Sequence, residues 1–310
     1  MENKISGLHH VTAIAGMAKR NIDFYTKVLG LRLVKKTVNF DDPGTYHFYF
    51  GDEKGTPGTI LTFFPWEGVR QGVTGTGMIS SVNYSVPSQS LEFWQERFNQ
   101  HNVKFDAADE KFGEKSISFR DPDGLNIRFI ANDADARTPW YTNEVNEKVA
   151  TRGFQGVSLL VQKADPTLQI LSDVLGYQLQ QQEGSNYRLR TNENDTASLV
   201  DITEAHGAAR GINSAGTFHH VAFRVRNEDV LMNYHEKVQL AGLSVTPKID
   251  RDYFFSIYFR EPGGVLFEIA TDNPGFTRDE SLDELGTHLK LPGQYEAARK
   301  DIEAVLPALA

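Results

Sequence analysis

The sequence predicts an α+β protein. Four modules of strand, helix and three further strands (βαβββ) form two domains, each a curved mixed sheet closed into a cup. Three observations predict this class: a strand-like segment followed by a helical segment recurs four times in 310 residues, glycine-containing turns separate the later strands, and the length suits about two domains. One module alone would leave its sheet half covered, so we expect the modules to pair.

The repeated pattern is clearest in the fourth module. Residues 217–225 (TFHHVAFRV) are typical of a strand, and residues 259–271 (FREPGGVLFEIAT) of two strands joined by a Pro-Gly-Gly turn. Between them a helix is predicted from Asn227 to Gly242. Asn227 is a suitable N-cap, apolar residues follow at helical spacing, and Gly242 can end the helix.

The other modules follow the same order. Their first strands are expected at residues 7–14, 80–86 and 154–161, their helices at 21–30, 90–100 and 166–176, and their closing strands at 58–64, 119–131 and 198–202. In the third module Asp165 is the expected helix cap, with Pro166 at the first helical position and Gly176 at the end. Residues 132–152 are polar and are expected to connect the two halves, whereas 294–306 are predicted to form a terminal amphipathic helix.

Composition and charge exclude several classes of function. Hydrophobic residues make up 40% and charged residues 24%, and no apolar run reaches the roughly 20 residues of a membrane-spanning helix. The absence of cysteine excludes disulfides and a catalytic thiol. The net charge of −9 argues against a nucleic-acid or acidic-membrane surface. Residues 1–7 are too short and polar for a signal peptide, so a cytoplasmic location is expected.

The four modules differ at two equivalent positions. At the first-strand position they carry His10, Ser81, Gly156 and His220, and at the last-strand position Thr62, Arg128, Asp201 and Glu268. Because side chains alternate between the faces of a strand, His10, His220 and Glu268 are each expected on the face that looks into a cup. Three small neighbours would leave room above them for a substrate: Thr12, Ala222 and Ala270.

Two imidazoles and one carboxylate form a facial triad that suits Fe(II) or Mn(II), while zinc and nickel stay open on affinity alone. Such a triad leaves about three positions of an octahedral ion free for O2 and an organic oxygen. We therefore predict a metal site at His10, His220 and Glu268. The histidines outside the two His-His pairs are expected to be structural or exposed: His47, His101, His206, His235 and His288.

The predicted ligands come from the first and fourth modules, so those modules must share one cup. The predicted metal-binding domain combines module 1 (residues 1–70) with module 4 (210–275), and the second domain combines module 2 (75–135) with module 3 (150–205). Residues 276–310 form a C-terminal helical tail. The chain is thus expected to leave the metal-binding domain, build the second domain, and return.

Four strings carry a resemblance to a known superfamily: GLHHVTAI at 7–14, YHFYFGDEKGTPGT at 46–59, GTFHHVAFRV at 216–225 and SIYFREPGGVLFEIATDNPGF at 256–276. Together they make the chain similar to the vicinal oxygen chelate superfamily, which contains glyoxalases, bleomycin-resistance proteins and extradiol dioxygenases. Within it, the chain resembles the ring-cleaving dioxygenases that act on hydroquinones. The resemblance covers essentially the whole chain and implies the glyoxalase/bleomycin-resistance/extradiol dioxygenase fold.

The resemblance also implies an Fe(II)-dependent enzyme that opens a hydroquinone-class ring with O2, in aromatic hydrocarbon catabolism or quinone detoxification. It implies that the second histidine of each pair binds iron, as alternation also predicts. Further catalytic roles are implied for Thr12, His219, Arg251 and Tyr258. Alternation puts His219 on the face opposite His220, so a twist or bulge would be needed to bring it to the substrate. The residues by themselves leave hydroquinone and catechol both open.

Two other functions stay open. A glyoxalase-type lyase or isomerase would use a similar cup, but such sites generally present a second glutamate, and the equivalent residue is Thr62. A protein that only sequesters an aromatic drug or quinone would need no metal ligands. The expected partners are a small aromatic molecule and O2, without nucleic acid or membrane. The acidic composition and terminal helix are compatible with a homo-oligomer.

Overall fold

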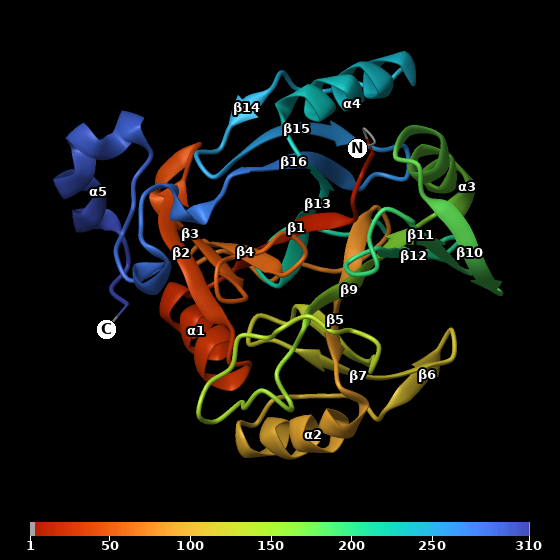
Figure 1. The fold of residues 1–310 in the computed structure, drawn as a ribbon, viewed down its shortest axis with the longest axis horizontal. Coiled ribbons are helices and arrows are strands. Elements are labelled where there is room, and N and C mark those ends of the chain that lie inside the picture. Colours follow the sequence, from red (N-terminus) through yellow and green to blue (C-terminus); the bar gives the residue numbers. More distant parts are fainter. Residues whose placement is uncertain (1–3, 310) are drawn as a thin grey trace.

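The computed structural model of the protein describes residues 4–309 and shows two curved sheets of eight strands each (Figure 1). The first sheet has the order β14-β15-β16-β13-β1-β4-β3-β2, and the second β10-β11-β12-β9-β5-β8-β7-β6. In each sheet the two central strands are antiparallel to one another, and each is parallel to a later strand of its own module. The predicted α+β class with two curved mixed sheets is confirmed.

The first sheet contains strands from both ends of the chain: β1 (Leu8–Ala15), β2 (Arg32–Asn39), β3 (Asp42–Gly51), β4 (Ile60–Pro65), β13 (Thr217–Val225), β14 (Ile249–Asp250), β15 (Phe254–Arg260) and β16 (Leu266–Pro274). The second contains the strands between them: β5 (Met78–Val86), β6 (Asp109–Lys111), β7 (Glu114–Arg120), β8 (Asn126–Ala131), β9 (Gly153–Val161), β10 (Gln178–Glu183), β11 (Asn186–Arg190) and β12 (Leu199–Glu204). The chain therefore builds half of the first sheet, then the whole second sheet, and then returns. The residue boundaries of the two domains stay a prediction.

The helices are short. The α-helices are α1 (Ala18–Asp23), α2 (Leu91–Gln100), α3 (Ala164–Gln169), α4 (Glu228–Leu240) and α5 (Arg299–Val305). π-Helical turns extend α1 and α3: η1 (Phe24–Val28) and η3 (Ile170–Val174). The 3-10 turns are η2 (Ser88–Ser90), η4 (Phe276–Arg278), η5 (Leu282–Glu284) and η6 (Gly293–Ala298). None of the helices within residues 4–309 is long and apolar enough to cross a membrane.

One predicted helix cap is right and one is wrong. Asn227 is the N-cap of α4, and its side chain accepts a backbone hydrogen bond from the first turn. In the third module α3 begins at Ala164, so Asp165 and Pro166 lie inside its first turn. The Glu204 carboxylate on β12 accepts a hydrogen bond from the Ala164 N–H at 2.7 Å. A residue distant in sequence therefore satisfies the helix N-terminus that Asp165 was expected to cap.

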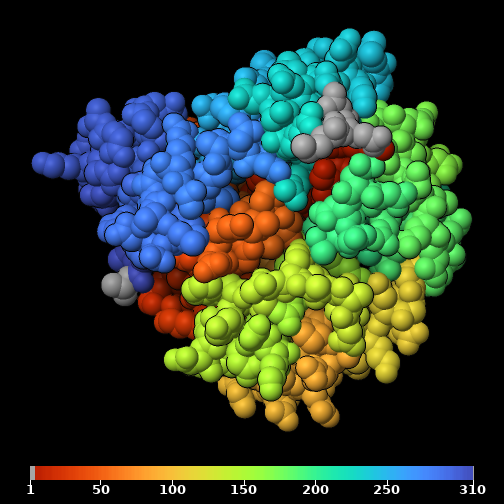
Figure 2. Space-filling view, viewed as in Figure 1, coloured from red at the N-terminus to blue at the C-terminus, as the bar shows by residue number. Residues whose placement is uncertain are grey.

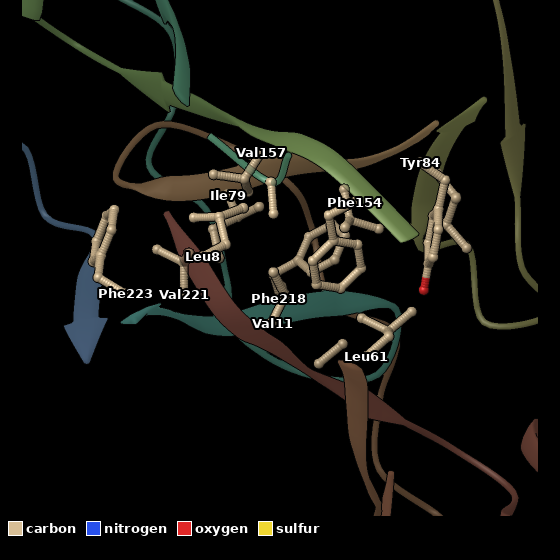
Figure 3. Close-up of a cluster of buried hydrophobic side chains, with 14 of the residues drawn as sticks. Leu8, Val11, Leu61, Ile79, Tyr84, Phe154, Val157, Phe218, Val221 and Phe223 are labelled. Atoms are coloured by element: carbon tan, nitrogen blue, oxygen red, sulfur yellow. The ribbon is translucent and has the colours of Figure 1, made fainter. Parts of the chain in front are cut away.

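The hydrophobic core runs through both sheets as one continuous cluster (Figure 3). Val11 on β1 and Val221 on β13 are paired across the first sheet, and both are fully buried. Val157 on β9 and Ile79 on β5 join the same cluster from the second sheet. The apolar set of each first strand thus faces this core. The alternate set, which includes His10, is left for the inside of a cup.

The four first strands share a β-bulge immediately before the equivalent position. In each of the two central strand pairs, the register skips the residue that precedes the position compared above. The four skipped residues are His9, Ser80, Gln155 and His219. A bulge leaves its extra residue unpaired and turns the side chain away from strict alternation. The repeat therefore extends to a backbone irregularity, which both cups retain.

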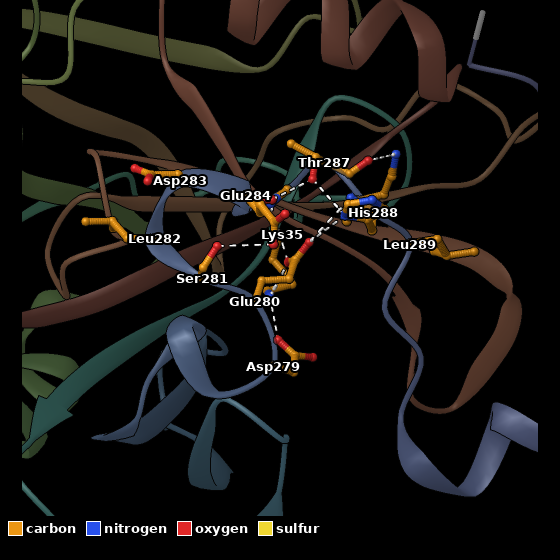
Figure 4. Close-up of polar contacts among 12 residues, drawn as sticks. Lys35, Asp279, Glu280, Ser281, Leu282, Asp283, Glu284, Thr287, His288 and Leu289 are labelled. Atoms are coloured by element: carbon orange, nitrogen blue, oxygen red, sulfur yellow. Dashed lines mark hydrogen bonds and ion pairs between the residues drawn. The ribbon is translucent and has the colours of Figure 1, made fainter.

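A buried ion-pair cluster fastens the C-terminal tail to β2 (Figure 4). Lys35 on β2 is fully buried and pairs with Asp279 at 2.6 Å and with Glu280. Glu280 also accepts hydrogen bonds from the backbone N–H groups of Gly286 and His288, each at 3.4 Å. Beyond this cluster, η6 and α5 end the tail at one end of the molecule (Figure 2). Because buried charges are costly without partners, the cluster holds the tail in one place.

Candidate metal centre

Three side chains from neighbouring strands meet inside the first cup. His10 lies on β1, His220 on β13 and Glu268 on β16, and these strands are adjacent in the sheet. Glu268 Oε2 is 2.8 Å from His220 Nε2 and 3.2 Å from His10 Nε2, and the two Nε2 atoms are 3.4 Å apart. All three residues are buried. The structure thus brings together the residues that the sequence predicts as ligands.

The spacing and the unmet polar atoms of this cluster fit a metal ion. Adjacent ligand atoms about 2.1 Å from one octahedral ion are about 3 Å apart, close to the observed separations. Within residues 4–309, neither carboxylate oxygen of Glu268 accepts a hydrogen bond, although both are buried. A buried carboxylate without donors is costly, and a cation held by its oxygen atoms would offset that cost.

The protonation states of the cluster also suit a metal. Burial opposes ionisation of Glu268, but the neighbouring His10 and His220 outweigh burial and hold the pKa of this carboxyl well below its usual range. Burial lowers the pKa of His220, and Glu268 only partly opposes that effect. The cluster therefore offers an ionised carboxylate and an uncharged His220 imidazole, which are the forms that bind metal.

The histidine that precedes each predicted ligand contacts it directly. His9 Nδ1 lies 2.9 Å from His10 Nδ1, and His219 Nδ1 lies 2.7 Å from His220 Nδ1. Burial lowers the pKa of His9 well below its usual value and the pKa of His219 to about 3, so both rings are neutral. A ligand whose Nε2 faces an ion carries its proton on Nδ1 and can donate it to the preceding histidine. The bulge that His219 needs in order to reach this side is present.

A cavity of about 320 Å³ lies beside the three predicted ligands. His10 and His220 form part of its wall, together with the predicted site residues Thr12, His219 and the Arg251–Tyr258 pair. Most of the remaining wall is apolar: Phe40, Phe64, Trp66, Ile249, Phe254 and Leu266. A mostly apolar cavity with a few convergent polar groups is typical of a small-molecule site.

Two of the three small neighbours expected to leave room for a substrate, Ala222 and Ala270, do not line this cavity. Both alanines are fully buried in a small hydrophobic cluster that also contains Phe254 and Phe276. Phe276 belongs to η4 at the start of the C-terminal tail, so a residue of the tail packs in the same cluster as the two alanines. Of the three small neighbours, Thr12 alone lines the cavity. The strand pattern could not show this, because Phe276 comes from outside the repeated units.

Arg251 and Tyr258 face the cavity as a hydrogen-bonded pair. Tyr258 on β15 lies opposite Glu268 in the sheet register. Arg251 Nε donates to Tyr258 Oη at 3.2 Å, and Ser256 Oγ lies 3.1 Å from the same oxygen. Burial raises the pKa of Tyr258, and Glu268 raises it further, so the phenol keeps its proton at neutral pH. The pair therefore offers the cavity a neutral hydroxyl and a fixed positive charge.

A run of hydrogen-bonded side chains in the cavity wall escapes the sequence analysis. Tyr49 Oη lies 3.0 Å from His47 Nδ1, and His47 Nε2 lies 2.9 Å from Thr62 Oγ1. Thr62 Oγ1 in turn lies 2.9 Å from Thr12 Oγ1. Alternation along β3 could have found His47, because Phe48 between His47 and Tyr49 lies in the core. The other histidines expected to be structural or exposed lie away from this wall: His101, His206, His235 and His288.

Comparison with known proteins is consistent with this fold and cluster. A family model described as the "Glyoxalase/Bleomycin resistance protein/Dioxygenase superfamily" matches residues 7–129 and 153–269. The chain belongs to this superfamily. The matched segments contain all three residues of the cluster and end before the C-terminal tail.

Relatives aligned over nearly the whole chain define the group within the superfamily. "Putative ring-cleaving dioxygenase MhqO" of Bacillus subtilis (strain 168) is 45% identical over 98% of this chain and 96% of its own length. "Chlorohydroquinone/hydroquinone 1,2-dioxygenase" of Sphingobium indicum is 36% identical over 97% and 96%. A crystal structure of a "putative dioxygenase" from Bacillus subtilis has a TM-score of 0.95 at 44% identity, covering 99% of this chain and 98% of that one. Within the superfamily, the chain therefore belongs with the ring-cleaving dioxygenases.

Proposed function

We propose that the protein is an Fe(II)-dependent dioxygenase that opens hydroquinone-class aromatic rings with O2. The observation that carries the proposal is the convergence of His10, His220 and Glu268 beside a cavity with aromatic walls. The relatives named as ring-cleaving and hydroquinone dioxygenases support the substrate class. Nitrogen and oxygen ligands without sulfur suit Fe(II), and Mn(II) is the alternative ion.

The three ligands would occupy one face of the ion and leave the cavity side free. Bound there, Fe(II) supplies Lewis acidity toward a phenolic oxygen and an electron path between the ring and O2. The chain contributes the setting for this chemistry. His9 and His219 hold the imidazoles of His10 and His220 in orientation through the Nδ1 contacts.

Arg251 and Tyr258 would act on the oxygen atoms of the substrate. The Arg251 guanidinium would stabilise negative charge that develops there, and it already holds Tyr258 Oη in place. The Tyr258 hydroxyl, which keeps its proton, would donate a hydrogen bond to the same end of the substrate. These roles require no rearrangement, because both groups already line the cavity.

His219, Thr12 and the aromatic walls would complete the substrate site. Within residues 4–309, His219 Nε2 makes no hydrogen bond, so with Nδ1 accepting from His220 its Nε2–H is free to donate into the cavity. The Thr12 hydroxyl is held by Thr62. Phe64, Trp66 and Phe254 would hold the flat ring and keep water from it.

A glyoxalase-type lyase fits these residues less well. Thr62 occupies the place where such sites generally carry a second glutamate, and its hydroxyl is engaged with Thr12 and His47. A protein that only sequesters an aromatic ligand would not need buried, converging ligands whose carboxylate lacks hydrogen-bond donors. Neither a glyoxalase-type lyase nor a sequestering protein would consume O2 in an iron-dependent reaction.

Metal analysis and oxygen uptake test the proposal. Protein purified without O2 should hold iron and should consume O2 when hydroquinone is added, whereas Glu268→Gln should lose both properties. His235→Gln is the matched control, because it removes an imidazole from α4, away from the cavity. Iron-loaded protein that consumes no O2 with hydroquinone, chlorohydroquinone or catechol would overturn the proposal.

A further inference from the structure

A second cavity, of about 330 Å³, adjoins the cavity beside His10, His220 and Glu268, which we call the metal cavity. The two cavities share His219 and Leu266 in their walls. Within residues 4–309, no aspartate or glutamate lines the second cavity, although the chain has a net charge of −9. Two arginines, Arg210 and Arg260, line it instead. A cavity lined by positive groups and by no acidic side chain favours an anionic occupant.

Both guanidinium groups meet at the glycine turn that leads into β16. Arg260 Nη1 donates to the Gly264 carbonyl oxygen at 2.6 Å. Within residues 4–309, this is the only hydrogen bond that the Arg260 guanidinium makes. A Cβ atom placed on Gly264 would lie 3.4 Å from Arg210 Nη2. Among the residues that the structure describes, the Arg210 guanidinium has no partner in a hydrogen bond or an ion pair. The remaining donors of both side chains are therefore available to a ligand.

The equivalent turn of the second module carries an aspartate that the turn of the fourth module lacks. There Arg120 precedes the turn, and the turn residue Asp123 binds Arg20 and accepts a hydrogen bond from the Gly16 N–H at 3.0 Å. In the fourth module Arg260 precedes the turn, and Gly263 stands where Asp123 stands. A Cβ on Gly263 would lie 2.3 Å from Thr167 Oγ1, so no acidic side chain fits at this position. The one carboxylate of this turn, Glu261, is buried and accepts hydrogen bonds from the Thr167 hydroxyl and from the Gly263 and Val265 N–H groups. Within residues 4–309 it forms no ion pair with Arg210 or Arg260, so both guanidinium groups keep donors for a ligand.

We propose that the second cavity binds the carboxylate of the ring-opened product through Arg210 and Arg260. This inference rests on the proposed function. Opening the ring breaks the bond between a hydroxyl-bearing carbon and its neighbour, and each carbon gains one atom of O2. The first carbon becomes a carboxyl group and the neighbour an aldehyde. The carboxyl group then loses its proton at neutral pH, since such groups have pKa values near 4.

The site therefore distinguishes product from substrate by charge. Hydroquinone is neutral at pH 7, because phenols have pKa values near 10, so it gains little from two guanidinium groups. The product carries a carboxylate, which guanidinium groups bind with charge-assisted and often bidentate hydrogen bonds. His219 and Leu266 separate the cavity where the carboxylate forms from the cavity that attracts it. The second cavity gives the product a place outside the metal centre.

Calorimetric titration with cis,cis-muconate, an unsaturated dicarboxylate, tests the site directly. Iron-loaded protein without O2 is titrated as wild type, as Arg210→Gln, as Arg260→Gln and as the double variant. We expect the dissociation constant to rise roughly 3- to 10-fold for each single change and further for the double variant, as is typical for lost charge-assisted hydrogen bonds at partly exposed sites. Added salt should weaken the binding of muconate to the wild type. It should also reduce the difference in dissociation constant between the wild type and the variants.

Arg120→Gln is the matched control, because it removes the equivalent arginine at the turn of the second module. Equal muconate affinity in wild type and the double variant, or an equal loss in Arg120→Gln, would overturn the proposal.

Steady-state turnover separates this inference from the proposed function. With hydroquinone, the double variant should keep the wild-type KM and show weaker inhibition by accumulated product. Arginine-dependent muconate binding in a protein that consumes no O2 would sink the dioxygenase proposal and retain the anion site. Normal O2 uptake together with unchanged product inhibition in the double variant would retain the dioxygenase proposal and remove the anion site.

Discussion

The two cups share one backbone plan and differ in how their interior charges are met. In the second cup, Arg188 binds Asp201 through two contacts of 2.7 and 2.9 Å and Glu114 at 2.7 Å. Asp201 stands at the position that Glu268 occupies in the fourth module, yet its charge is matched within the protein. In the first cup, the Glu268 carboxylate accepts no hydrogen bond within residues 4–309. The carboxylate of the second cup therefore has its counter-charge within the protein, whereas the carboxylate of the first cup would be matched by the proposed cation.

The difference shows that the fold itself confers no metal site. Both cups carry the bulge, the curved sheet and the inward-facing positions. In the second cup, Ser81 and Gly156 occupy the positions of the two histidines. Arg128 occupies the last-strand position of the second module, equivalent to Glu268 in the fourth, and pairs with Asp109 at 3.2 Å. Buried charges require partners, so each cup needs either an internal counter-charge or a bound ion. Four experiments would break or sharpen this contrast, beginning with the largest expected effect.

Removing the Glu268 carboxylate should abolish the difference in metal binding between the two cups. Glu268→Ala is expected to lose bound iron and at least about 1,000-fold in kcat/KM, because ligand loss should exceed the 10–100-fold typical of outer-shell changes. Metal content and oxygen uptake measure both effects. Full iron content with full activity in Glu268→Ala would show that the ligand assignment is wrong.

Removing the carboxylate of the second cup should affect stability alone. Asp201→Asn leaves Arg188 buried with one fewer counter-charge, and breaking such a buried pair typically costs about 3–5 kcal/mol. Denaturant unfolding should report this loss, while iron content per folded molecule stays at the wild-type level. Loss of iron without loss of stability would mean that the second cup takes part in metal binding.

The bulge histidines should matter only in the first cup. His9→Ala removes the Nδ1 partner of His10 and should weaken iron binding about 10–100-fold, the usual effect of losing a group that orients a ligand. Ser80→Ala changes the equivalent bulge residue of the second cup and should leave iron affinity unchanged. Competition with a chelator without O2 measures both affinities. Equal affinities in the two variants would remove the proposed role of His9.

The smallest effect is expected from pH. The pKa of His220 is lowered by burial and that of Glu268 is held down by its histidine neighbours, so both stay deprotonated until the pH falls through these lowered values. Protons should therefore begin to compete with iron only below about 6.5, the ordinary pKa of histidine. Iron affinity measured without O2 should be flat between about pH 6.5 and 8. A steep decline within that window would show that a ligand titrates normally.

Local patterns in the sequence predict much of this architecture. The repeat of strand and helix predicts two curved sheets, and alternation along β1, β13 and β16 predicts that His10, His220 and Glu268 face one interior. These inferences succeed because the side-chain direction in a strand has a period of two residues and needs no knowledge of the neighbours. The cap of α4 at Asn227 succeeds for the same reason, since its hydrogen bond closes within one turn.

Other features depend on segments that are distant in sequence. Glu204 on β12 caps the N-terminus of α3, and Phe276 of the tail packs in one hydrophobic cluster with Ala222 and Ala270. By itself, the sequence determined the modules, the faces of their strands and the residue types at each equivalent position. The shared ligand set also predicted which modules pair. The tertiary structure alone decided which interior charges find partners and where space is left. Those outcomes follow from long-range packing, in which each contact depends on where every other segment lies.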